Sequence, residues 1–143
     1  MSTIRVAIAG ASGRMGRTLI RALSEADEMR LAFALEQPGH AELGKDSGVL
    51  AGLPPNGIFL TDDPLAALAA CDAVLDFTAP AASVPLSELA AQARIVHVIG
   101  TTGFSDADLT RLKASARHAV IVKSGNMSLG VNLLAALAKK PGN

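Results

Sequence analysis

Short apolar runs recur along the chain, separated by segments with helical periodicity. The runs are nearly continuous and rich in valine, isoleucine and leucine, which is typical of strands that are covered on both faces. They occupy residues 4–10, 30–36, 57–61, 72–78, 94–100 and 119–125. Their alternation with helices predicts a parallel sheet with right-handed crossover connections.

Segments with helical periodicity fill the intervals between these runs. In the first interval, apolar residues recur at spacings of four and three, as on the buried face of a helix: Met15, Leu19, Leu23 and Ala26. Further helices are predicted at residues 64–70, 83–91 and 105–118. The last of them opens with Ser105 and Asp108 in the spacing of a capping box. Residues 37–57 are rich in glycine and proline and show no clear period, so we expect one long loop there.

The length and apolar content of the chain suit a single domain. It has 143 residues, and half of them are apolar, which is enough for a core of its own. The pattern predicts an α/β fold, a doubly wound, mostly parallel sheet of about six strands with helices on both faces. We expect this domain to span residues 1–127, and residues 128–143 to begin a further helix.

Composition narrows the functions open to such a domain. Thirteen basic residues balance thirteen acidic ones, and aromatic residues make up only 3% of the chain. Both the charge and the stacking platforms of a nucleic-acid-binding protein are therefore missing. No apolar stretch reaches the length of a membrane span, and the N-terminus lacks the order of a signal peptide. These features predict a cytoplasmic protein that binds neither nucleic acid nor membrane.

The lone cysteine, Cys71, lies between a helical pattern and a strand pattern, with no histidine at motif spacing. A single cysteine in a chain forms no internal disulfide. We therefore expect Cys71 to be a buried structural thiol rather than a reactive one.

Three glycines follow the first strand pattern at intervals of three: Gly10, Gly13 and Gly16. A glycine turn that leads from a buried strand into a helix gathers backbone N–H groups at the positive end of the helix dipole, where an anion is stabilised. Gly10 permits the sharp turn, Gly13 allows a pyrophosphate close to the backbone, and Gly16 allows the helix to pack against the strand. The spacing predicts a phosphate-binding turn of the Rossmann type.

A carboxylate strengthens this prediction. Glu36 ends the second strand pattern, about 20 positions after the glycine turn, where it can accept hydrogen bonds from both hydroxyls of an adenosine ribose. Arg14, in the first turn of the helix, can reach a phosphate or stack on an adenine. The alternative is a plain glycine-rich turn beside a solvated surface glutamate.

Two further glycine-containing stretches end strand patterns at the same predicted edge of the sheet. Residues 100–104, GTTGF, follow the fifth pattern, and residues 124–128, SGNMS, follow the sixth. Ligands bind at the carboxyl ends of strands in open α/β folds. The hydroxyl and amide groups of these stretches suit a ring that carries a carboxamide, although each stretch alone is also compatible with a simple turn.

Together these motifs resemble a known family. Similar segments occur in the same order in the N-terminal half of 4-hydroxy-tetrahydrodipicolinate reductase, an enzyme of lysine and diaminopimelate biosynthesis: VAIAGASGRMGR (6–17), FALE (33–36), DFTAP (76–80), VIGTTGF (98–104) and SGNMSLGVN (124–132). The family transfers hydride from a reduced nicotinamide to a cyclic, unsaturated dicarboxylate and completes the reaction by protonation. By this resemblance the chain is the cofactor-binding domain of an NAD(P)H-dependent oxidoreductase.

The resemblance also implies where the parts of the dinucleotide bind. The pyrophosphate would be held by Gly10, Ala11, Ser12, Gly13, Arg14 and Met15, with Phe77 and Thr78 nearby. The adenosine ribose would lie at Glu36 and Gln37. The nicotinamide end would be formed by Gly100, Thr101, Thr102, Ser124, Gly125, Asn126 and Met127.

The ribose site predicts a preference for NADH over NADPH. Glu36 favours a free 2′-hydroxyl and repels a 2′-phosphate. Relatives that use NADPH well often have an arginine directly after this acidic residue, whereas this chain has Gln37. Arg14 could reverse the preference by turning toward the ribose.

The resemblance implies that the catalytic half is absent. Family members take their substrate-binding cations and proton donor from a motif with paired histidines, a following lysine and a serine-glycine-threonine loop, none of which occurs in this sequence. His40, His97 and His118 stand alone and are interpreted as packed or surface residues, and Lys123 as solvated. We expect no catalytic and no metal-binding residue here. The full-length enzyme would be a homotetramer through its other half, so this chain should be a monomer that binds cofactor without turnover.

Two other classes of protein remain open. Another dehydrogenase, such as an aspartate or homoserine dehydrogenase, would explain the glycine turn but not residues 100–104 and 124–130 together. A non-catalytic NAD(H)- or CoA-binding module, such as a redox sensor, would suit the length. Glu36 argues against CoA, because a carboxylate repels the 3′-phosphate on its ribose.

Overall fold

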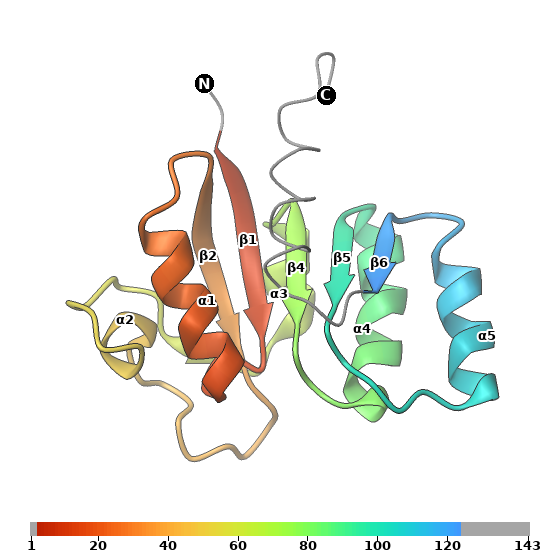
Figure 1. The fold of residues 1–143 in the computed structure, drawn as a ribbon, viewed down its shortest axis with the longest axis horizontal. Helices are drawn as coiled ribbons and strands as arrows, with labels where there is room; N and C mark the ends of the chain where they lie inside the picture. Colours follow the sequence, from red (N-terminus) through yellow and green to blue (C-terminus); the bar gives the residue numbers. More distant parts are fainter. Residues whose placement is uncertain (1–2, 124–143) are drawn as a thin grey trace.

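A computed structural model of the chain describes residues 3–123 (Figure 1). Its strands are β1 (Ile4–Ala9), β2 (Met29–Leu35), β3 (Leu60–Thr61), β4 (Ala73–Asp76), β5 (Val96–Ile99) and β6 (Ile121–Lys123). All described pairs are parallel, and the six strands lie in the order β3-β2-β1-β4-β5-β6. The order reverses between β1 and β4, and in open α/β sheets ligands bind at the carboxyl ends of the strands at such a point. This confirms the predicted doubly wound parallel sheet.

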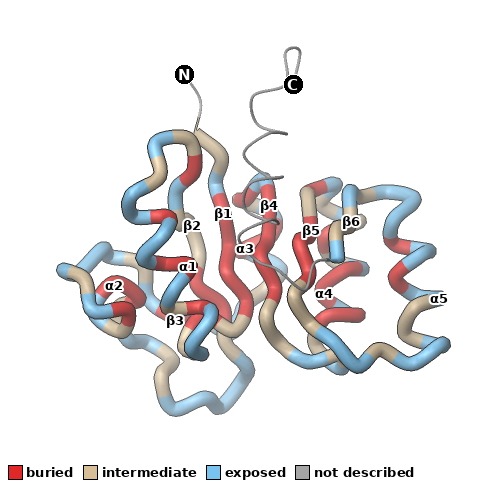
Figure 2. The backbone as a smooth tube through the Cα atoms, in the orientation of Figure 1, coloured by how far each residue is buried: buried red, intermediate tan, exposed pale blue. Residues whose placement is uncertain are grey.

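Helices cover both faces of the sheet: α1 (Arg14–Ser24), α2 (Ser47–Leu50), α3 (Pro64–Ala69), α4 (Pro80–Ala93) and α5 (Asp106–Ser115). The alternation of side chains along β1 divides the core. Val6 and Ile8 pack with α1 on one face, whereas Ala7 and Ala9 pack with α3 and α4 on the other. Figure 2 shows the resulting buried stripe along the central strands. Burial on both faces explains why residues 6–9 of β1 form a continuous apolar run.

The helix α5 begins as the sequence predicts. Ser105 Oγ accepts the Asp108 N–H at 3.1 Å, and the Asp108 carboxylate accepts the Ser105 N–H at 3.0 Å. This is a complete capping box. Helix α4, in contrast, is longer than predicted: it begins at Pro80, whose missing N–H is no loss at a first helical position.

The prediction of one unstructured loop over residues 37–57 was wrong in part. A short helix, α2, lies within it and is capped by Asp46, whose carboxylate accepts the N–H of Val49 at 3.1 Å. The same carboxylate accepts the N–H groups of Asn56 and Gly57. These bonds hold the chain before β3 against α2. Strand β3 itself has two residues, fewer than the predicted run over 57–61.

Cys71 is buried, as expected, with 4% of its surface exposed. It packs with α3 and α4 beside the sheet. Burial raises the pKa of its thiol to about 11. In the same range of residues, 3–123, no helix combines the length and the apolar character that a membrane crossing requires.

The environment of Cys71 predicts slow reaction with disulfide reagents. The thiolate is the reactive species, and a raised pKa makes it scarce at pH 8, so Ellman's reagent should modify the native chain about 100-fold more slowly than the unfolded chain. The rates can be compared by absorbance with and without guanidinium chloride. Equal rates in the two states would contradict the buried position of this thiol.

Candidate functional site

The turn between β1 and α1 contains three glycines that meet different constraints. Gly10 has a φ of +80°, and a Cβ there would come within 3.0 Å of the Phe77 carbonyl oxygen. At Gly16 a Cβ would overlap the Gly10 carbonyl oxygen and lie 2.7 Å from the Ala11 carbonyl oxygen. At Gly13 a Cβ would meet only the Gly10 carbonyl oxygen, at 3.4 Å. The fold itself thus requires glycine at two positions and has room for a Cβ at the third.

Helix α1 presents unused N–H groups at this turn. Gly13 is its N-cap and offers no side chain to cap it. The N–H groups of Gly10 and Ala11 are already used, because both donate to the Leu35 carbonyl oxygen at 3.1 Å. The N–H groups of the first helical turn have no acceptor within the helix. An anion at this turn would therefore meet the first turn of α1, beginning with Arg14, rather than the residues directly after β1.

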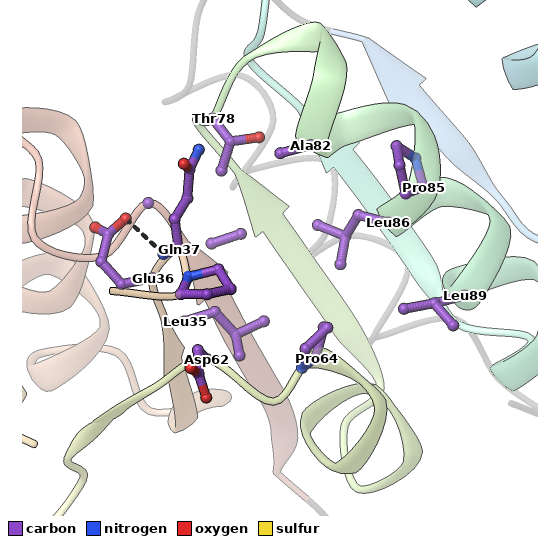
Figure 3. A pocket seen from close by; sticks show the side chains of 13 residues that line it. Leu35, Glu36, Gln37, Asp62, Pro64, Thr78, Ala82, Pro85, Leu86 and Leu89 are labelled. Carbon is purple, nitrogen blue, oxygen red and sulfur yellow. Dashed lines mark hydrogen bonds between the residues drawn. The ribbon is translucent and has the colours of Figure 1, made fainter. Parts of the chain in front are cut away.

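Glu36 follows the last residue of β2 and turns back toward the glycine turn. Its Oε2 accepts hydrogen bonds from the Ser12 N–H at 3.1 Å and from Ser12 Oγ at 2.5 Å. Its Oε1 accepts the N–H of Gln37 at 3.2 Å, drawn as the dashed line in Figure 3. These bonds fix a half-buried carboxylate at the rim of the turn, where a ligand hydroxyl can reach it.

The structure adds His40 to this rim. Its Nε2 lies 3.3 Å from Ser12 Oγ, and its Nδ1 accepts the N–H of Glu42 at 3.0 Å. The ring proton therefore belongs on Nε2, where it can be donated to Ser12. The sequence predicted an isolated histidine, which is right about its exposure but not about its neighbour. No local motif could have shown this contact, because it depends on the path of the loop after Glu36.

A cavity of about 210 Å³ lies beside Glu36, between the end of β2 and helix α4 (Figure 3). Its walls are mainly apolar and include Leu35, Pro64, Leu86 and Leu89. Glu36, Gln37 and Asp62 supply its polar rim. An apolar cavity with a carboxylate at its edge suits a flat ring attached to a sugar.

A second carboxylate, Asp76, ends β4 and is fully buried, as is His97 on β5. His97 Nε2 lies 2.9 Å from Asp76 Oδ2. Asp76 Oδ1 accepts the Thr78 N–H at 3.0 Å and the Thr78 hydroxyl at 2.6 Å. Burial by itself raises the pKa of Asp76, but the hydrogen bonds from His97 and Thr78, with the His97 ring and the Ser83 hydroxyl close by, outweigh it and hold the pKa below its ordinary value. The buried group is therefore a carboxylate at neutral pH.

Some of the remaining predicted site residues lie within the described residues and others lie outside them. Arg14 and Met15 are exposed on the first turn of α1, so Met15 does not belong to the buried face of this helix that its spacing suggested. Thr102 is exposed after β5. The N–H of Gly100 is tied to the carbonyl oxygen of Asp76 at 2.8 Å, while Thr101 is partly exposed. Ser124, Gly125, Asn126 and Met127 lie outside the described residues.

Three other residues have the packed or exposed positions that the sequence suggested. His118 and Lys123 are exposed. His97 is packed, as expected, although its buried carboxylate partner was not predicted. Among residues 3–123 no cluster of three or more histidine, cysteine, aspartate or glutamate side chains could hold a metal ion.

The strand order, the glycine turn and the acidic residue after β2 define a Rossmann-type nucleotide-binding domain. Solved dehydrogenases and reductases share this fold. Aspartate semialdehyde dehydrogenase II of Vibrio cholerae matches 87% of the chain with 38% of its own, at a TM-score of 0.64 and 19% identity. Biliverdin reductase of Synechocystis sp. PCC 6803 matches 86% of the chain with 38% of its own, at a TM-score of 0.68 and 17% identity.

Sequence comparison assigns the chain to one family among the many that share this fold. Residues 4–127 match the family model of the dihydrodipicolinate reductase N-terminus, and the chain belongs to this family. The 4-hydroxy-tetrahydrodipicolinate reductase of Beijerinckia indica is 58% identical over 98% of the chain and 52% of its own length. That of Dinoroseobacter shibae is 58% identical over 94% of the chain and 50% of its own length. The chain thus spans about half the length of these curated relatives.

A solved member of the family agrees with this assignment. Dipicolinate-bound dihydrodipicolinate reductase from Paenisporosarcina sp. TG-14 is 28% identical and covers 96% of the chain with 54% of its own, at a TM-score of 0.68. The resemblance inferred from the sequence motifs is thereby confirmed. Membership of this family sets aside the aspartate and homoserine dehydrogenases as alternatives.

The surroundings of the glycines predict that substitution by serine will lower the stability of the fold at Gly16 but not at Gly13. Gly16→Ser should lower the free energy of unfolding by about 1–3 kcal/mol, because its Cβ collides with backbone. Gly13→Ser has room and adds an N-cap hydroxyl, so its stability should change by less than about 0.5 kcal/mol or rise. Urea denaturation of the two variants measures both values. Similar losses at both positions would contradict the close packing assigned to Gly16.

Proposed function

We propose that this domain binds NADH or NADPH and serves as the cofactor half of a reductase that reduces a cyclic, unsaturated dicarboxylate. The observation that carries this proposal is the Glu36 carboxylate, fixed by Ser12 beside the glycine turn. An acidic side chain at the end of the second strand is placed to accept hydrogen bonds from the ribose hydroxyls of an adenosine. The names of the curated relatives and of the solved dihydrodipicolinate reductase support the reductase activity.

Each part of the dinucleotide has a place in this proposal. The adenine occupies the apolar cavity beside Leu86, and its ribose meets Glu36 and Gln37. The pyrophosphate lies over the glycine turn at residues 10–15, where the N–H groups that remain free are those of the first turn of α1, from Arg14 on. The nicotinamide lies at the carboxyl ends of β5 and β6, at residues 100–102 and 124–127. The reduced cofactor supplies the hydride, and the residues of this chain bind and orient it.

The second reactant is proposed to bind elsewhere, in the half of the relatives that this chain does not cover. Rate enhancement needs a substrate positioned by cations and an acid. His97 is fully buried and thus unable to touch a substrate. We propose that residues 128–143 lead toward that other half, that the chain alone is monomeric, and that it works in the cytoplasm, where Cys71 stays reduced.

Gly13→Val tests the proposal directly. The valine would stand where the pyrophosphate approaches, so NADH binding should weaken at least about 10-fold. Calorimetric titration measures the dissociation constants, and circular dichroism checks that the fold is kept. Thr18→Val, on the exposed face of the same helix, is the matched control and should bind NADH as the parent does. Undiminished binding by Gly13→Val would refute the phosphate site.

Cofactor preference tests the role of Glu36. A 2′-phosphate beside this carboxylate should cost about 1–3 kcal/mol, so the parent should bind NADH about 5- to 150-fold more tightly than NADPH. Glu36→Gln removes the charge and keeps an acceptor for Ser12, and it should shrink this ratio. Glu25→Gln, at the far end of α1, should leave the ratio unchanged. Tighter binding of NADPH than of NADH by the parent would overturn the assignment.

Because the cofactor is proposed to bind to this chain and the substrate elsewhere, we expect the chain to bind NADH without oxidising it. NADH oxidation by this chain should stay at background when fresh substrate is supplied at high protein concentration, because the substrate has no site among the groups assigned above. A binding titration of the same sample shows that the cofactor site is intact. Turnover of about 1 per second or more, in the range of ordinary enzymes, would mean that catalytic groups lie within this chain.

A further inference from the structure

A chain of hydrogen bonds connects the buried end of β4 with the partly exposed start of the loop after β5. It runs from Asp76 to Thr78 at 2.6 Å, from Thr78 to Ser83 at 3.1 Å, and from Ser83 to Thr101 at 2.8 Å. Asp76 and Ser83 are fully buried. Thr101 is partly exposed and lies at the carboxyl edge of the sheet. A buried charge is therefore linked to that edge through three hydroxyl groups.

The charge of Asp76 fixes the direction of every bond in this chain. A carboxylate only accepts hydrogen bonds, and a hydroxyl has one proton to donate. Thr78 therefore donates to Asp76, and its oxygen then accepts the proton of Ser83. Ser83, having donated inward, accepts the proton of Thr101. The Thr101 hydroxyl thus points its proton into the protein and its free lone pairs outward.

His97 keeps the other side of Asp76 in place. Its Nε2 faces Asp76 Oδ2 at 2.9 Å and donates the ring proton to it. Its Nδ1 is buried and has no hydrogen-bond partner among the described residues. A proton on Nδ1 would be a buried donor without an acceptor, which is costly. The ring therefore serves as a single donor that holds the carboxylate, so that Asp76 Oδ1 stays turned toward Thr78.

An outward-facing acceptor at Thr101 has a definite chemical partner. It can accept a hydrogen bond from an N–H group and has no proton left for a carbonyl oxygen. We propose that Asp76 is a positioning residue that makes Thr101 an acceptor for the amide N–H of a nicotinamide carboxamide. This inference rests on the proposed function, which places the nicotinamide at this edge of the sheet. It makes Asp76 a source of selectivity for the amide, although three hydroxyl groups separate this carboxylate from the ligand.

Three ligands separate this effect from general binding. NADH carries the amide, its reduced 3-acetylpyridine analogue carries a methyl ketone without N–H, and ADP-ribose has no nicotinamide. The parent should bind NADH about 3- to 10-fold more tightly than the analogue, as expected for one hydrogen bond. In Asp76→Asn the His97 ring proton still requires an oxygen opposite it, so the amide nitrogen faces Thr78 and the bond from the Thr78 N–H is lost. The amide then donates to the Thr78 hydroxyl and allows the chain to reverse, so this ratio should fall below about two. Affinity for ADP-ribose should stay within about twofold of the parent.

Asp72→Asn is the matched control. Asp72 precedes β4 and pairs with Arg5 at an exposed position, 3.1 Å apart, so its substitution should leave the ratio of NADH to analogue unchanged. Thr101→Val removes the proposed acceptor at a partly exposed position and should abolish the ratio even if Asp76→Asn fails to fold. A ratio retained in Thr101→Val would overturn the inference.

The remaining outcomes separate the inference from the proposed function. Equal weakening of all three ligands in a folded Asp76→Asn would overturn the positioning role and leave Asp76 as a structural residue. A parent that binds NADH and ADP-ribose but does not distinguish NADH from its analogue would overturn the inference alone. A parent that binds neither NADH nor ADP-ribose would overturn the proposed function itself.

Discussion

The close contact between helix α1 and the turn after β1 is the constraint on which the site depends. A side chain at Gly16 would collide with two backbone carbonyl oxygens, and Gly10 adopts a left-handed conformation beside Phe77. The turn is also tied to β2, because the N–H groups of Gly10 and Ala11 donate to the Leu35 carbonyl oxygen. These contacts bring the positive end of α1 to the edge of the sheet where the strand order reverses. The phosphate site and the ribose carboxylate then lie side by side in space, because Glu36 at the end of β2 accepts the N–H of Ser12 in the turn.

Two carboxylates at this edge differ in what they can do. Glu36 is half-buried at the mouth of the cavity, and its bonds to Ser12 can be exchanged for bonds to ligand hydroxyls. Asp76 is fully buried, and His97 and Thr78 already satisfy its oxygens. The first is suited to direct contact with a ligand, whereas the second acts through the hydroxyl groups that it orients. Two carboxylates thus have different roles, because they differ in burial and in their hydrogen-bond partners.

The sequence predicted those features whose causes are local. The sheet was visible because residues 6–9 of β1 are buried on both faces and form one apolar run, and the capping box was visible because its partners are three positions apart. Contacts between distant segments were not predicted. Asp76 meets His97 only through the register of β4 and β5, and His40 reaches Ser12 only through the path of a long loop that no periodicity specifies.

A crystal structure of the chain with bound NADH is the most direct test of the dinucleotide site. We expect the adenine in the cavity beside Leu86, both hydroxyls of its ribose within hydrogen-bond distance of the Glu36 carboxylate, and the pyrophosphate at the N-terminus of α1. The nicotinamide should then lie beside Thr101. Electron density for the dinucleotide away from the glycine turn, or in the reverse orientation with the nicotinamide ribose at Glu36, would contradict it.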